Sequence, residues 1–117
     1  MTDGGYLELS ALEFHVMLAL VAEPLYGYAI KEAVVSESSG ALQPHAGSLY
    51  RVLARLMQWK LVTEIEAEPD APPHPGLARK YYALTPRGRK ALGAAARRLK
   101  QSARLAEERL GIVVGGR

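Results

Sequence analysis

The chain has 117 residues and a mass of 12.7 kDa, which fits one compact domain with at most one appended element. Apolar residues make up 49% of the chain and charged residues 23%, as in ordinary folded proteins. The absence of cysteine excludes a disulfide scaffold, a thiolate zinc site and a cysteine nucleophile. The longest apolar run, Val16 to Ala22, is too short to span a membrane, and no charged-then-apolar leader opens the chain. We therefore expect a cytoplasmic protein that has no contact with membranes.

The net charge of +3 conceals an asymmetry along the chain. Residues 1–78 contain 4 basic and 10 acidic residues, a net charge of −6, whereas residues 79–117 contain 11 basic and 2 acidic residues, a net charge of +9. Positive charge concentrated in one third of the chain favours a polyanionic partner. A solvated cationic helix is the alternative interpretation of the same charges.

Three short helices are predicted in the first half of the chain. A capping box of Ser10 and Glu13 starts a helix from about Ala11 to Ala22. Its apolar side chains cover almost the whole circumference, so part of this surface is predicted to meet a second subunit. Further helices are expected from Tyr26 or Gly27 to about Ser36 and from about Ala46 to Trp59. The third helix has a core-facing stripe of Leu49, Val52, Leu53 and Leu56.

A β-hairpin is predicted next. Residues 61–67 alternate between apolar and polar, which is typical of a strand with one solvated face. Residues 68–78 are rich in proline and form a loop, and a second strand follows from Arg79 to Leu84.

The last predicted element is a long helix that ends near Leu110. Thr85 is its expected N-cap and Pro86 its first residue. Its apolar residues are spaced 4, 3, 4, 3 and 4 apart, a heptad seam that favours pairing with a second subunit. We therefore expect a homodimer whose interface contains Leu12, Val16, Leu20, Leu92, Ala96, Leu99, Ala103, Ala106 and Leu110.

This order of elements is that of a mainly α (α+β) winged helix-turn-helix protein, in which the third helix enters the DNA major groove and the hairpin loop is the wing. Two parts are expected: a DNA-binding domain over residues 7–85 and a C-terminal dimerisation helix over residues 86–110. The enzymatic alternative has little support, because His15, His45 and His74 lie on separate elements and Glu64, Glu66 and Glu68 form an ordinary solvated strand face. No catalytic residue, metal or cofactor is expected.

Candidate DNA contacts lie on the third helix and on the hairpin. Opposite the apolar stripe, the helix presents Gly47, Tyr50, Arg51, Ala54, Arg55 and Gln58, where arginine can bind guanine edges and small residues allow close approach. Arg79 and Lys80 begin the second strand, where cations would meet phosphates. The first strand is acidic, and its carboxylates are placed to pair with Arg79 and Lys80 across the hairpin.

Three segments resemble PadR-family transcriptional regulators, in the order and spacing of that family. They are Leu25–Ile30 (LYGYAI), Gly47–Leu53 (GSLYRVL) with Leu56, and Lys80–Gly88 (KYYALTPRG). The resemblance implies a homodimeric winged-helix repressor on a palindromic operator in double-stranded DNA, with a dimer interface of the first and last helices. It also implies a small-molecule effector, often a phenolic acid or a drug, that releases the DNA. The last helix has no aromatic residue, which departs from the drug-binding members.

The same resemblance assigns roles to individual residues. Ser48, Tyr50 and Arg51 would be contacts of the recognition helix, Tyr28 and Lys31 would approach the DNA backbone, and Arg79 and Lys80 would belong to the wing. A competing hypothesis keeps the fold but makes the chain a protein-interaction module that docks through its long helix. The acidic first strand and the presence of only two arginines on the third helix favour that alternative.

Overall fold

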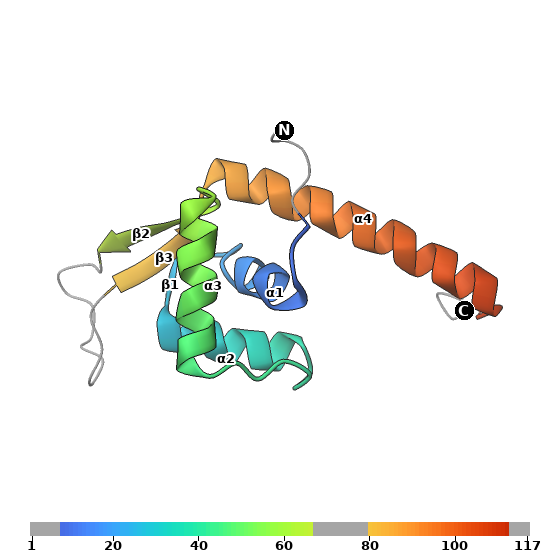
Figure 1. The fold of residues 1–117 in the computed structure, drawn as a ribbon, viewed down its shortest axis with the longest axis horizontal. Coiled ribbons are helices and arrows are strands. Elements are labelled where there is room, and N and C mark those ends of the chain that lie inside the picture. The colour runs from blue at the N-terminus through green and yellow to red at the C-terminus, as the bar shows by residue number, and fades with distance from the viewer. Residues whose placement is uncertain (1–7, 67–79, 113–117) are drawn as a thin grey trace.

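The computed structural model describes residues 8–66 and 80–112, and within them the chain forms four helices and a three-stranded antiparallel sheet (Figure 1). The elements are α1 (Ala11–Ala19), β1 (Leu25–Tyr26), α2 (Gly27–Glu37), α3 (Ala46–Gln58), β2 (Val62–Glu66), β3 (Lys80–Leu84) and α4 (Pro86–Leu110). The predicted order of three helices, a hairpin and a long helix is confirmed. The proline-rich loop and Arg79 lie outside the described residues.

The predicted helix starts are confirmed by their caps. The Ser10 side chain accepts from the Glu13 amide while the Glu13 carboxylate accepts from the Ser10 amide, which completes the capping box. The Thr85 hydroxyl accepts from the Gly88 amide, and Pro86 begins α4. α1 ends three residues earlier than expected, because the amides of Leu20 and Val21 turn back to the carbonyls of Met17 and Leu18.

The sheet contains a strand that the sequence did not predict. β1 pairs with β3, and β3 pairs with β2, so β3 is the central strand. β1 consists of only two residues, between Pro24 and the start of α2, and is too short to show the alternation by which strands are found.

The solvated face predicted for the first hairpin strand extends to both sides of β2. Only Val62 is buried, and the four residues after it, Ile65 included, are exposed. Figure 1 agrees with this exposure, since β2 extends away from the helices that the structure describes.

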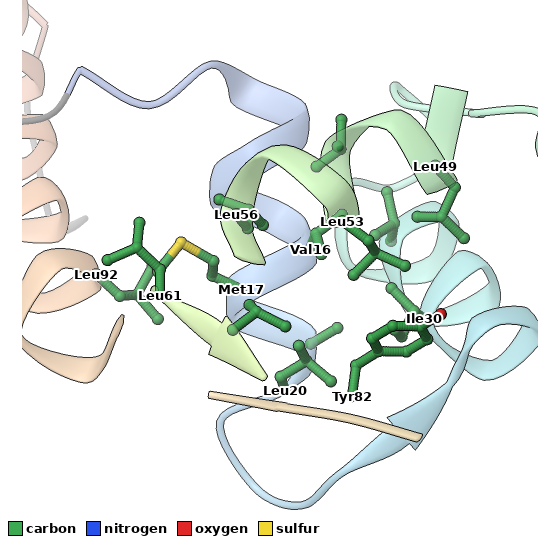
Figure 2. Packing of buried hydrophobic residues seen from close by; sticks show 14 residues of the cluster. Val16, Met17, Leu20, Ile30, Leu49, Leu53, Leu56, Leu61, Tyr82 and Leu92 are labelled. Carbon is green, nitrogen blue, oxygen red and sulfur yellow. The ribbon is translucent and has the colours of Figure 1, made fainter. Parts of the chain in front are cut away.

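The core lies where α1, α2, α3 and the sheet meet (Figure 2). The predicted stripe of α3 is confirmed, because Leu49, Val52, Leu53 and Leu56 are all buried. Val16 and Leu20, which the sequence assigned to a dimer interface, also point into this core, and so does Leu92 of α4. Their side chains are at most 8% exposed, so they contact their own subunit and have almost no surface left for a second one.

α4 packs on the core through its first half only. Leu92 and Ala95 are buried, whereas the helix from Ala96 onward is exposed almost throughout and extends past the rest of the subunit (Figure 1). In the described part of the chain, no helix has the length and apolarity needed to cross a membrane.

Candidate nucleic-acid interface

The exposed face of α3 is set by the burial of its leucine and valine stripe on the opposite side. Gly47, Tyr50, Arg51, Ala54 and Gln58 are all exposed. Arg51 extends back along the helix, so that its Nη1 atom lies 3.7 Å from the position a Cβ atom would occupy on Gly47. The middle of this face therefore consists of an arginine between two small residues, a surface that a groove of DNA can approach closely.

His45 and Ser48 form the start of α3. The Nδ1 atom of His45 accepts from the Ser48 amide at 3.4 Å, and the Ser48 hydroxyl lies 3.1 Å from Nε2 of the same ring. This confirms the interpretation of His45 as a helix-start residue. The predicted contact residue Ser48 is half-buried and already has a partner in His45.

Arg55 forms an ion pair that the sequence did not reveal. Its Nε atom donates to Oε2 of Glu13 at 2.7 Å, across 42 positions of the chain. The Arg55 side chain is nevertheless 45% exposed, whereas that of Glu13 is only 6% exposed. The local capping role predicted for Glu13 is confirmed, but the second oxygen of its carboxylate contacts Arg55 on α3. A glutamate among apolar residues of α1 was the only signal of a buried partner.

Tyrosine side chains gather where α2, α3 and the sheet meet. The Tyr50 hydroxyl of α3 packs so closely on the start of α2 that a Cβ atom on Gly27 would collide with it. Tyr26 and Tyr81 pack edge to face, with ring centroids 5.8 Å apart. Tyr28 is exposed, and a hydrogen bond with Glu32 raises the pKa of its phenol. Lys31, on the same helix, is half-buried. The structure thus places Tyr28 and Lys31 on α2 and Tyr50 at its junction with α3.

The hairpin presents Lys80, and the predicted pairing across it is confirmed for this residue. Its Nζ atom lies 3.0 Å from Oε2 of Glu64, and this hydrogen bond raises the pKa of the exposed ammonium group. In the strand register Lys80 stands opposite Glu66. The positive charge of Lys80 is therefore partly compensated within the chain.

A groove of about 600 Å³ separates the start of α1 from the middle of α4. Its lining includes Phe14, His15, Ala95, Arg98, Leu99 and Ser102. The Nδ1 atom of His15 is buried and has no hydrogen-bond partner among the described residues. Leu99, one of these lining residues, is 54% exposed, and Leu110 at the end of α4 is 72% exposed. The predicted interface residue Leu12 is half-buried against the subunit's own core.

The core-anchored third helix, with its small and cationic exposed face, and the hairpin beside it define a winged helix-turn-helix DNA-binding protein. Comparison with known proteins agrees with this class. The model of the transcriptional regulator PadR-like family matches residues 16–94, and the chain belongs to that family.

Several solved structures have the same fold. A PadR-family transcription regulator from Clostridium difficile superposes with a TM-score of 0.71 at 20% identity, over 86% of this chain and 99% of that one. A PadR-like regulator from Bacillus cereus has a TM-score of 0.70 at 23% identity, over 86% and 91% of the two chains. A PadR-like transcription factor from Bacteroides fragilis is 31% identical, with a TM-score of 0.66 over 83% and 87%.

A relative by sequence is an uncharacterized 37.1 kDa protein in transposon TN4556 of Streptomyces fradiae. The two are 40% identical over 77 residues, which is 66% of this chain and 19% of that protein. The aligned segment thus covers about a fifth of that relative's length.

Proposed function

We propose that this regulator is a repressor that binds a palindromic operator as a homodimer, with α3 in the major groove. The observation that carries this proposal is the exposed position of Arg51 between Gly47 and Ala54, opposite a fully buried stripe. An arginine on a helix face that can approach the groove floor can donate two hydrogen bonds to guanine, which is the most common specific contact to a base.

The other predicted contacts surround this helix. Tyr28 and Lys31 lie on α2, and Tyr50 lies where α2 meets α3, so these residues are assigned to the DNA backbone or to base edges. Ser48 begins the same face. Lys80 on the hairpin is assigned to DNA phosphates. Arg79, for which the resemblance implies the same role, lies outside the described residues.

The homodimer is supported by the second half of α4. Leu92, the first residue of the heptad seam, is buried in the core of its own subunit. The other seam residues are exposed: Ala96, Leu99, Ala103, Ala106 and Leu110. The exposed seam continues into the groove beside α1, which Leu99 helps to line. An apolar helix face of this length that joins a groove suits the same helix of a second copy.

A twofold dimer explains the expected operator. Two copies of α3 related by a twofold axis read two half-sites of opposite orientation, so the operator is a palindrome. Repression follows where the operator overlaps the DNA that RNA polymerase must bind, and we assign this role to the dimer as part of the proposal. Access to that DNA agrees with the expected cytoplasmic location.

The proposal is tested by selecting DNA from a random-sequence pool with the purified protein and measuring affinity for the selected and for random DNA at several salt concentrations. We expect a saturable complex with a selected inverted repeat that binds at least a thousandfold more tightly than random DNA. A protein-interaction module would enrich no sequence and would show the same weak, salt-sensitive binding to every DNA.

A further inference from the structure

We propose that Glu13 is a positioning residue for DNA reading: it holds Arg55 in one orientation on the recognition helix and removes its charge from non-specific binding. This inference rests on the proposed function. Glu13 lies on α1, outside the surface that would touch DNA, and it acts through Arg55.

Both oxygens of the Glu13 carboxylate have separate partners. Oε1 accepts from the Ser10 amide at 2.8 Å, and Oε2 accepts from Nε of Arg55 at 2.7 Å. The first contact fixes the carboxylate to the start of α1, so the second fixes Arg55 relative to α1. A planar guanidinium held by its Nε atom has a defined orientation, and its Nη groups remain to donate elsewhere.

Arg55 belongs to the row of polar residues that would read DNA. Ser48, Arg51 and Arg55 are spaced three and four residues apart, so they lie next to one another along α3. Two arginines one turn apart repel each other, and the Glu13 carboxylate compensates one of the two charges. Of the two arginines on α3, Arg51 is then the one that meets the DNA with its positive charge uncompensated by Glu13.

The exposure of the two partners argues for a role beyond helix packing. A pair that served only to join α1 to α3 would be equally effective if both side chains were buried or apolar. Here the carboxylate is buried and the guanidinium is nearly half exposed. The buried Glu13 carboxylate therefore holds the Arg55 guanidinium from the interior side, and the rest of the guanidinium faces solvent. In this arrangement a carboxylate can orient an arginine toward a ligand.

The test compares Glu13→Gln with Ser10→Ala. Glu13→Gln keeps an oxygen for the Ser10 amide but loses the charge that holds Arg55. Ser10→Ala removes the hydroxyl that caps the Glu13 amide at 3.1 Å and leaves the ion pair in place. Both variants weaken the start of α1, so a purely structural role predicts the same behaviour for both.

Affinities for the selected operator and for random DNA are measured across a salt series. In Glu13→Gln we expect operator affinity to fall by roughly tenfold, as for the loss of one charge-assisted contact. Affinity for random DNA should rise, with a salt slope that is steeper by about 0.9, because Arg55 becomes a free cation. Ser10→Ala should leave both affinities and the slope unchanged.

Two further variants test the proposal at Arg55, in case Glu13→Gln folds poorly. Arg55→Lys keeps the charge but loses the planar donor set, and should also lower the ratio of operator to random affinity. In an Arg55→Gln background, Glu13→Gln should have no further effect on that ratio. An unchanged ratio in Glu13→Gln and Arg55→Lys, or equal losses in Ser10→Ala and Glu13→Gln, overturns the proposal. If the wild-type protein selects no DNA at all, the proposed function fails instead.

Discussion

Gly88 of α4 packs directly against the main-chain carbonyl of Leu61, which precedes β2. A Cβ atom on Gly88 would collide with the Leu61 oxygen, and this same oxygen accepts from the Thr85 amide at 3.1 Å. The contact joins the first turn of α4 to the end of α3, because the Leu61 amide in turn donates to the Leu56 carbonyl of α3. The orientation of α4 relative to α3 therefore requires a residue without a side chain, glycine, at position 88.

Gly88→Ala should lower the free energy of unfolding by about 1–3 kcal/mol, since a backbone carbonyl cannot move aside as a flexible side chain can. Gly93→Ala is the matched control on the same helix, where the nearest atom is the end of the Arg97 side chain at 3.7 Å. That control should raise stability by about 0.5–1 kcal/mol through helix propensity. Denaturant unfolding of both variants measures the difference, and equal stabilities would contradict the packing described.

Gly47→Ala should raise the stability of the protein but lower its affinity for the operator. Gly47 is exposed in the first turn of α3, and the atoms nearest to a Cβ atom there would be those of His45 and Arg51, at ordinary contact distances of 3.6–3.7 Å. Stability should rise by a few tenths to about 1 kcal/mol. Operator affinity should fall, because the methyl group stands between the helix and the groove floor. If operator affinity is unchanged, this end of α3 does not approach DNA.

Leu99→Glu tests the proposed dimer without damaging the subunit. Leu99 is 54% exposed in the single subunit, so a glutamate there costs little until a second copy covers it. Sedimentation should show a folded monomer. Leu105→Glu is the control: it lies on the same helix, is 39% exposed and is directed away from the seam, and it should remain dimeric. A Leu99→Glu protein that is still dimeric would place the interface elsewhere.

Glu64→Gln should strengthen binding to every DNA. The carboxylate that holds Lys80 at 3.0 Å competes with phosphate for the same ammonium group. Its removal should raise the affinity for operator and random DNA by similar factors and make the salt slope steeper by up to about 0.9. Thr63→Ala, on the same exposed strand, is the neutral control. If Glu64→Gln binds no more tightly than the wild type, Lys80 does not contact the DNA backbone.

Local signals in the sequence were sufficient for most of the fold. The caps at Ser10 and Thr85 and the stripe that begins at Leu49 depend only on residues a few positions apart, and all three are present in the structure. Two features that join distant segments were missed, although the hairpin and its Lys80–Glu64 pair were predicted. The partner of Arg55 lies 42 positions away, and β1 exists only because β3 lies beside it.

The helix α1 shows why burial could not be assigned from periodicity alone. Part of its apolar circumference, including Val16 and Leu20, was interpreted as surface for a second subunit, yet these two residues are enclosed by α2, α3 and the sheet of their own subunit. Two short helices and a sheet can surround one central helix even in a chain of this size. The residues of α1 that remain accessible, such as Leu18, are fewer than the pattern indicated.

The central claim is that Arg51 on α3 reads the sequence of the operator, and Arg51→Ala tests it most directly. Affinities of the wild type and the variant are measured for the selected operator and for random DNA under the same salt conditions. We predict a loss of about 1–3 kcal/mol on the operator and little change on random DNA. A variant whose ratio of operator to random affinity equals that of the wild type would contradict the assignment of α3 as the reading helix.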